Sequence, residues 1–183
     1  AGHYLGNHTY SHPDFNKLGY PEFITDTVAN EPLLASYFKP SVYRFFRYPF
    51  LHEGNTQEKR DKVREFLFNQ GYKIAQVTLD FSEWVWNEPY NRCLKNGDLK
   101  RNQWMNKPYL DEAVNNLRAA ELLSEFLFGR QIRHITLFHP YIFDAEMLDA
   151  VLTAWESKGV KFISFREASK DPAYAINLFS AFC

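Results

Sequence analysis

The sequence predicts an α/β fold built on a parallel sheet. Short runs rich in β-branched and aromatic residues alternate with segments whose apolar residues recur at helical spacing. Such alternation favours a parallel sheet or an α/β barrel. Polar residues follow several of the expected strands, at the strand ends where such folds collect their active sites. With 183 residues, 45% of them hydrophobic and 17% aromatic, the chain has enough core for one domain.

In the N-terminal half, helix-capping residues and prolines mark where the expected helices and strands begin and end. Residues 3–7 read as the end of a strand, and residues 15–38 carry a helical pattern that Pro32 interrupts. Residues 42–47 are expected to form a short strand. A helix over 56–70 begins at a threonine, a good N-cap residue, and stops before a glycine.

In the C-terminal half, residues 73–79 are rich in β-branched residues and are expected to form a strand. The stretch 93–107 is polar, with Asn96-Gly97-Asp98 marking a turn, and Pro108 is expected to open a long helix that ends at Gly129. The remaining expected elements are a strand over 132–138, a helix over 144–158 and a strand over 160–165.

Two histidines near the start of the chain form a candidate metal site. Residues 6–12 read G-N-H-T-Y-S-H, which places His8 and His12 four residues apart. If this segment is one helical turn, both rings lie on the same face and reach one cation. A catalytic zinc normally takes three protein ligands and keeps one position open, so a third ligand must come from elsewhere.

Three further motifs follow in order. They are R-Y-P-F at residues 47–50, D-F-S-E-W at 80–84 and I-T-L-F-H at 135–139. Together with the histidine segment, they resemble the second to fifth motifs of the polysaccharide deacetylase family, the NodB-homology or family 4 carbohydrate esterases. The resemblance runs from the first residues to about Tyr174.

This resemblance implies a deformed (β/α) barrel of about seven strands, here lacking its first strands. The expected domain covers residues 1–174, as the C-terminal portion of a NodB-like domain, and residues 175–183 form an apolar tail. The family's first motif is an Asp-Asp pair, which supplies a catalytic base and the third metal ligand. No Asp-Asp pair occurs in the sequence. By the family layout, two strand-helix units, on the order of 60 residues, would precede Ala1.

The resemblance also implies an activity. The chain is expected to belong to a metal-dependent hydrolase that removes N-acetyl groups from an N-acetylglucosamine polysaccharide, such as peptidoglycan or a chitin-like polymer. His8 and His12 would bind a divalent metal, with Zn²⁺ as the first expectation, and His139 would be the general acid. Arg47 would orient the base Asp of the missing motif.

Four residues are expected to bind substrate. The backbone N–H that follows Pro49 would stabilise the oxyanion, and Phe50 stands there in place of the family's usual Tyr. Trp84 and Leu137 would form the apolar slot for the acetyl methyl group. Both are equally compatible with plain core positions.

One acidic position departs from the family pattern. Glu83 stands before the tryptophan where the family more often has Asp, the residue that orients the acid histidine. Its extra methylene moves the carboxylate, which puts this role in doubt because a site tolerates little misplacement. Asp80 is the substitute candidate.

Several other residues are weaker candidates for the site. Asn7-His8-Thr9 matches a glycosylation sequon, but Asn7 is expected to be engaged structurally beside a metal ligand. His134 is expected to be a structural histidine, and His52 to line the cleft. Three aromatic residues in predicted loops are candidates to stack on sugar rings: Trp86, Tyr90 and Trp104.

Alternatives to the N-deacetylase remain open. One is an esterase for O-acetyl groups on xylan, another acts on non-sugar amides, and a third is a non-catalytic carbohydrate-binding remnant. An upstream Asp-Asp pair would distinguish the enzyme from the remnant.

The net charge of −1 predicts no nucleic-acid partner. The mean hydropathy of −0.43 and the lack of an 18-residue apolar run predict no membrane span. The resemblance implies a secreted, periplasmic or cell-envelope location.

Overall fold

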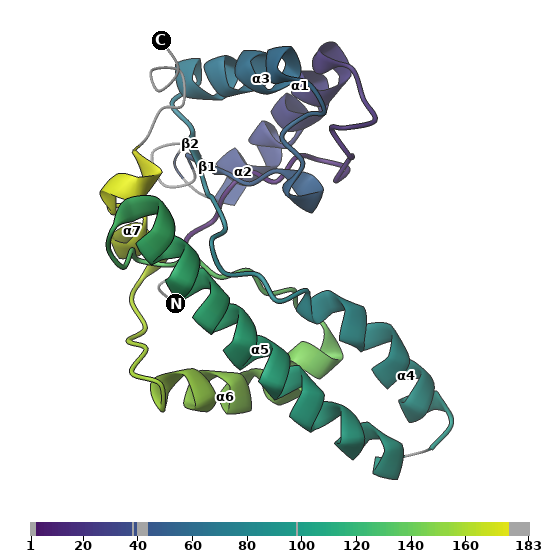
Figure 1. Ribbon diagram of the computed structural model, residues 1–183. Helices are drawn as coiled ribbons and strands as arrows, with labels where there is room; N and C mark the ends of the chain where they lie inside the picture. The colour runs from purple at the N-terminus through teal and green to yellow at the C-terminus, as the bar shows by residue number, and fades with distance from the viewer. Residues whose placement is uncertain (1–2, 38, 40–43, 98, 176–183) are drawn as a thin grey trace. The chain divides into compact units, whose positions relative to one another are not determined.

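The computed structural model describes residues 3–37, 39, 44–97 and 99–175. The chain divides into two compact units, Ala1–Gln76 and Val77–Cys183, and each is described by itself (Figure 1). The expected apolar tail over 175–183 lies, apart from its first residue, outside the described residues.

The first unit combines three α-helices with a short parallel sheet. Its elements are α1 (Tyr20–Ala29), α2 (Glu31–Tyr37), β1 (Phe45–Phe46), the 3₁₀ helix η2 (Pro49–Leu51), α3 (Gln57–Asn69) and β2 (Lys73–Ile74). The predicted break at Pro32 is confirmed, because Pro32 lies in the first turn of α2, where its missing N–H costs no helical bond. The predicted cap of α3 is also confirmed, since the Thr56 hydroxyl accepts a bond from Lys59 N at 3.2 Å.

The sheet of this unit is parallel but very short. Phe45 pairs with Lys73 and Phe46 with Ile74, and Asn7 forms a further parallel bridge to Phe46. The parallel direction confirms the sequence prediction. The described residues form a two-stranded sheet rather than a closed barrel, so the barrel stays a prediction.

Aromatic side chains fill the core of the first unit. Phe15 and Phe23 stack with their ring centroids 4.2 Å apart, and Phe46 meets Tyr48 edge to face at 5.0 Å. Phe23 of α1 also meets Phe46 of β1 edge to face at 6.2 Å, and burying each of these rings removes a large apolar area from water. The buried cluster consists of Phe15, Phe23, Phe46, Tyr48, Val63, Leu67 and Tyr72.

The second unit is mostly helical. Its elements are the 3₁₀ helix η3 (Glu83–Trp86), α4 (Asn87–Lys95), α5 (Leu99–Phe128), α6 (Ile142–Glu156), α7 (Phe165–Ala168) and the 3₁₀ helix η4 (Pro172–Tyr174). The prediction that Pro108 opens a helix is wrong, because Pro108 lies inside α5. The predicted turn at Asn96-Gly97-Asp98 is confirmed at Asn96 and Gly97, while α4 and α5 cover most of the rest of 93–107.

Packing explains why α5 continues through its proline. A proline inside a helix costs about 3 kcal/mol through the lost hydrogen bond and the ring clash. Met105 and Tyr109 lie one turn apart on either side of this region and are 1% and 0% exposed. Their burial offsets the cost of Pro108, so tertiary contacts override the local signal.

A regular helix-helix interface forms the core of the second unit. α5 packs against both α4 and α6 (Figure 1). On α6, buried residues recur every fourth position from Phe143 to Trp155, and the Trp155 indole donates to the Ala113 carbonyl at 3.0 Å. The face of α5 that they meet includes Met105, Tyr109, Ala113, Leu117 and Ala120.

The two strands predicted in this unit are mostly absent. Within 132–138, the structure shows an isolated parallel bridge between Leu79 and Thr136, and residues 160–164 are not assigned to a strand. Leu79 and Leu137 still approach through one backbone bond of 3.2 Å. The direction of this pairing agrees with the predicted α/β order, but the ladder is too short to count as two strands.

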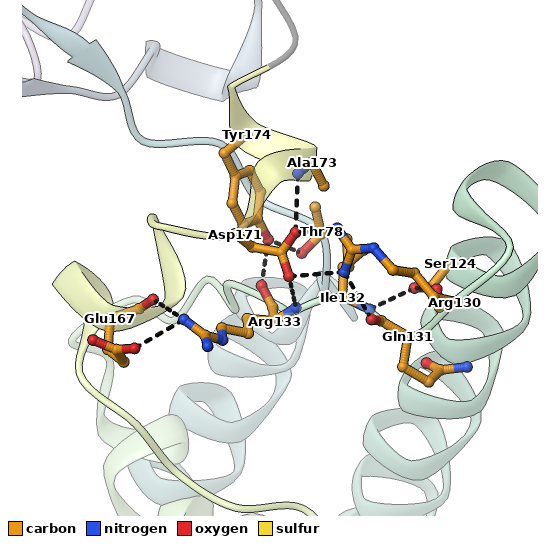
Figure 2. Close-up of polar contacts among 10 residues, drawn as sticks. All are labelled: Thr78, Ser124, Arg130, Gln131, Ile132, Arg133, Glu167, Asp171, Ala173 and Tyr174. Atoms are coloured by element: carbon orange, nitrogen blue, oxygen red, sulfur yellow. Dashed lines mark hydrogen bonds and ion pairs between the residues drawn. The ribbon is translucent and has the colours of Figure 1, made fainter.

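A buried aspartate attaches the C-terminal segment to this unit. Figure 2 shows Asp171 accepting bonds from the Arg130 guanidinium at 2.6 and 3.1 Å, from Arg133 N at 3.1 Å and from Ala173 N at 2.9 Å. Nearby, the Tyr174 hydroxyl donates to the Arg133 carbonyl at 2.7 Å. We call the group centred on Asp171 the C-terminal clamp.

Candidate active site

The two candidate metal ligands lie on an irregular turn. The helical turn considered for His8–His12 is not present, because residues 8–12 are non-helical and Thr9 and His12 have φ values of 66° and 56°. The two imidazoles are nevertheless close, with ring centroids 4.8 Å apart and planes at 75°. The closeness of the rings therefore comes from left-handed turn residues rather than from helical spacing.

Asn7 holds this turn from the inside. Its side chain is 1% exposed and uses all of its hydrogen-bonding capacity. The amide nitrogen donates to the Thr27 carbonyl and the Tyr72 hydroxyl, both at 3.0 Å. The amide oxygen accepts from Thr9 N at 2.9 Å and from the Asn30 side chain at 3.1 Å. The predicted structural engagement of Asn7 is confirmed.

Asp26 holds the outer part of the turn. Its carboxylate accepts bonds from Tyr10 N at 2.8 Å, from Ser11 N at 2.9 Å and from the Ser11 hydroxyl at 2.6 Å. Burial raises the pKa of Asp26, but the bonds from Ser11 and Tyr10 outweigh it and the net pKa is lowered. Asp26 therefore stays ionised and keeps the peptide groups before His12 in place.

A backbone contact sets the tautomer of His8. Its Nδ1 lies 2.7 Å from the Arg47 carbonyl oxygen. A carbonyl only accepts, so Nδ1 carries the proton and the lone pair of the neutral ring is on Nε2. Histidine ligands commonly donate their second ring nitrogen to a carbonyl or carboxylate, which fixes the ring and raises its basicity.

Arg47 follows β1 directly, as predicted. Its backbone N–H donates to the Asn7 carbonyl at 3.0 Å, and its Nε donates to the Ala75 carbonyl at 3.2 Å. The side chain is half-buried, and burial lowers the pKa of its guanidinium. Within the described part of the chain, no carboxylate lies at ion-pair distance from Arg47.

The segment after Arg47 has a strained backbone. Pro49 is buried, while Phe50 and the following Leu51 both have φ values of 57°. The left-handed region costs a non-glycine residue about 1–2 kcal/mol. Phe50 is 57% exposed, and its ring lies 4.7 Å from that of His12. Its backbone N–H bonds no acceptor among the described residues.

His52 lies near this group and is held by an acid. Its Nδ1 is 2.7 Å from an Asp14 carboxylate oxygen, and its ring is 5.9 Å from Phe50. The bond from His52 lowers the pKa of Asp14. His52 and His12 thus both contact the Phe50 ring, and the expectation that His52 lines the cleft stays a prediction.

In the second unit, Glu83 reaches the candidate acid. Its carboxyl group is fully buried, and Oε1 accepts from His139 Nδ1 at 2.5 Å and from His139 N at 2.7 Å. The extra methylene of Glu83 therefore does not prevent contact with His139. Asp80 instead accepts from Ser82 N at 2.8 Å and supports the left-handed conformation of that residue (φ 53°).

Asp144 is an acidic residue that the sequence reasoning missed. It is 3% exposed on α6, and the Tyr109 hydroxyl donates to its Oδ1 at 2.9 Å. The pKa of Asp144 is raised to about 6, mainly by burial and further by the negative charge of Glu83. The bond from Tyr109 and the charge of His139 act in the opposite direction and lower the pKa. In the sequence, Asp144 resembles any acidic residue in the first turn of a helix, so only tertiary contacts reveal it.

The apolar and aromatic candidates divide by exposure. Trp84 is 52% exposed, and Leu137 is half-buried. The proposal that Tyr90 stacks on sugar is wrong, because it is buried against Phe143 with centroids 4.7 Å apart. Trp86 packs on the core of the second unit, whereas Trp104 is exposed.

The site residues fall into two sets, one in each unit. In the first unit, His8, His12, Arg47, Pro49 and Phe50 form one group, and in the second unit Glu83 contacts His139. Among residues 3–37, 39, 44–97 and 99–175, no three His, Cys, Asp or Glu side chains are arranged to hold a metal ion.

Comparison with known families gives a match to part of the chain. Residues 1–75 match the family described as polysaccharide deacetylase, which is 75 of the 183 residues. The match confirms the resemblance for the segment that contains His8, His12, Arg47, Pro49 and Phe50. The match ends before the other candidate site residues, which are Asp80, Glu83, Trp84, Leu137 and His139. No curated protein matches the chain, and no solved structure does either.

None of the described helices has the length and apolar character needed to span a bilayer.

Proposed function

We propose that the chain belongs to a metal-dependent enzyme that removes N-acetyl groups from N-acetylglucosamine polysaccharide, because residues 1–75 match the polysaccharide deacetylase family. Peptidoglycan or a chitin-like polymer is the substrate class. The observation that carries the proposal is the His8–His12 pair, with rings 4.8 Å apart and His8 Nδ1 held by the Arg47 carbonyl.

The donor set fits a divalent metal. His8 and His12 would hold it, and imidazole nitrogens suit Zn²⁺ as well as Co²⁺ and Ni²⁺. Both rings are exposed. His8 Nδ1 is held by the Arg47 carbonyl, and histidines that bind metals in other proteins are commonly held in this way through the nitrogen that does not bind the metal. When bound, such a metal supplies an activated water and polarises the amide carbonyl.

Two other groups of the first unit would act on the reacting amide. Arg47 would orient a base carboxylate that is not among the described residues; its half-buried guanidinium, with one carbonyl partner, is suited to a bidentate contact. The Phe50 N–H would donate to the carbonyl oxygen as negative charge develops there. The left-handed φ of Phe50 supports this role, because strain of this kind clusters at functional sites.

The second unit would supply the acid. Glu83 holds His139 through Nδ1, so Nε2 would deliver the proton to the departing amine nitrogen. Trp84 and Leu137 would contact the acetyl methyl group. Asp80 would shape the loop before Glu83 rather than contact His139. We further propose that the protein acts outside the cytoplasm or in the cell envelope, where such glycans are found.

The testing experiment measures metal and acetate together. Zinc stoichiometry by calorimetry and acetate release from chitin oligomers or peptidoglycan would be compared for the natural protein and His12→Ala, with the exposed His3→Ala as control. We expect His12→Ala to lose both zinc binding and acetate release. Unchanged acetate release in this variant would contradict the proposal. Release from acetylated xylan alone would indicate an esterase, and glycan binding without release would indicate a non-catalytic module.

A further inference from the structure

Two consecutive residues of the η2 turn have a backbone that is costly for their residue type. Phe50 and Leu51 both have φ values of 57°, and neither is a glycine. The Leu51 N–H donates to the Tyr48 carbonyl at 3.1 Å, so Phe50 is the third residue of a tight turn, where a positive φ favours glycine or asparagine. Such a conformation persists only where surrounding contacts impose it.

The turn itself supplies little of this support. The His52 N–H donates to the Pro49 carbonyl at 3.1 Å, but this bond and the bond from Leu51 join residues within the turn. The side chains of Phe50 and Leu51 are 57% and 38% exposed, so their own burial is a weak anchor. Contacts from outside the turn must therefore hold it.

His52 connects the turn to a fixed carboxylate. Its Nδ1 lies 2.7 Å from Asp14 Oδ1, and because a carboxylate only accepts, Nδ1 carries its hydrogen whether the ring is neutral or charged. The Asp14 side chain is 14% exposed; its Oδ1 also accepts from Asn16 N at 2.9 Å, and its Oδ2 lies 3.4 Å from Lys17 Nζ. Asp14 is therefore held by its own loop, and the bond restrains His52.

The same loop also contacts Phe50 directly. Asp14 follows His12 by two residues, and the His12 ring lies 4.7 Å from the Phe50 ring, with the planes at 67°. The His52 ring lies 5.9 Å from the Phe50 ring, with the planes at 34°. Residues 12 and 14 thus restrain the turn at two points. Because the Phe50 N–H bonds no acceptor among the described residues, its direction depends on the turn that these contacts hold.

We infer that the bond between Asp14 and His52 holds Phe50 in its left-handed conformation, which makes His52 a positioning residue for the Phe50 N–H. Loss of the bond lets the turn relax toward negative φ, and the N–H then points in another direction. This conformational role does not depend on any activity. The consequence for catalysis rests on the proposed function, in which the Phe50 N–H donates to the carbonyl oxygen of the amide.

Nuclear magnetic resonance of the full chain tests the conformational role. A residue with positive φ has its amide hydrogen close to its own Hα, which gives a strong nuclear Overhauser effect between the two. We expect this strong effect for Phe50 in the natural protein and its loss in His52→Ala and in Asp14→Ala. The double variant should lose no more than either single variant, because each removes the same bond.

Two further variants serve as rescue and control. His52→Asn should keep the strong effect, because its side-chain nitrogen stands where Nδ1 does and can donate to Asp14. Lys17→Ala removes the contact to the other oxygen of Asp14 and should change nothing at Phe50. A strong effect retained in His52→Ala would overturn the inference, and so would its loss in Lys17→Ala. If Asp14→Ala does not fold, His52→Ala still decides, because it leaves the bond from Asn16 N in place.

Acetate release tests the link to catalysis. His52→Ala should lower kcat by up to about 10²-fold, the cost of misplacing a group by about 1 Å, and should leave KM and zinc stoichiometry near those of the natural protein. His52→Asn should recover most of kcat. An unchanged kcat in His52→Ala, or a loss of zinc binding that accounts for the fall, would contradict the positioning role. If the natural protein releases no acetate, the proposed function fails, and the Phe50 resonances still decide whether the Asp14–His52 bond holds the turn.

Discussion

The imidazole of His8 donates from Nδ1 to the backbone carbonyl of Arg47 across 2.7 Å. This bond joins two motifs that are far apart in the sequence, and it connects a candidate metal ligand to the residue that would orient a catalytic base. The Arg47 backbone N–H is at the same time bound to the Asn7 carbonyl at 3.0 Å. The two segments are therefore held as a backbone pair, and the orientation of His8 depends on their close approach.

Gly6→Ala tests that close approach. A Cβ at Gly6 would lie 2.9 Å from the Phe45 carbonyl oxygen, which must move to avoid it. Because the atom that the new Cβ meets belongs to the backbone and cannot rotate away, we expect a loss of about 1–3 kcal/mol in the free energy of unfolding. We also expect weaker zinc binding. Urea unfolding and calorimetry measure these effects.

The control is Gly19→Ala, where the added methyl would meet the flexible end of the Glu22 side chain. Gly19 has an ordinary φ of −72°, so alanine fits its backbone. If both variants were equally stable and bound zinc equally well, the close packing at Gly6 would have no role in the site.

His139→Ala should separate catalysis from metal binding. His139 is held by Glu83 and is not one of the proposed metal ligands, so its removal should leave the zinc content unchanged. Loss of a general acid typically slows turnover by about 10²–10⁴-fold. Single-turnover acetate release and zinc analysis of the same sample provide the measurement. Normal turnover in this variant would exclude His139 as the acid.

Asp171→Asn should weaken the C-terminal clamp in a pH-dependent way. The bond from Arg130 lowers the pKa of Asp171, so its contribution to stability is complete above the unfolded-state pKa and is lost as pH falls through the lower folded-state value. We expect a loss of about 1–3 kcal/mol at pH 7, since hydrogen bonds to a charged group are removed. Thermal unfolding from pH 7 to pH 3 should show the difference shrinking in acid.

Asp144→Asn should affect stability with the opposite sign. The pKa of Asp144 is raised to about 6, so between its unfolded-state value of 3.8 and 6 the folded state binds more protons than the unfolded state. Stability therefore falls as pH rises through this window, by at most about 3 kcal/mol for this group. Asparagine keeps an acceptor for Tyr109 and removes the charge.

The variant should consequently gain stability over the natural protein at pH 8, and the gain should vanish near pH 4. Urea unfolding at these two pH values measures the gain. Asp149→Asn, an exposed substitution on the same helix, should show neither effect. A loss of stability at pH 8 would mean that the Asp144 charge is compensated by a partner.

Local signals predicted several elements well. The Thr56 cap and the periodicity of α3 are properties of neighbouring residues, and they placed this helix within about one residue of its observed ends. The parallel direction of β1 and β2 also followed from their alternation with helices. The continuation of α5 through Pro108 did not, because it depends on the burial of Met105 and Tyr109 against other elements.

The sequence by itself determined which residue types are available for chemistry. It identified His8, His12 and Arg47 through spacing and family resemblance, and it paired Glu83 with His139 only as an expectation. Tertiary structure decided how these residues are held. Asn7 and Asp26 impose a left-handed turn on His8–His12, and burial gives Asp144 its raised pKa. Turn conformation and desolvation depend on groups that are distant along the chain, and a linear pattern does not contain those distances.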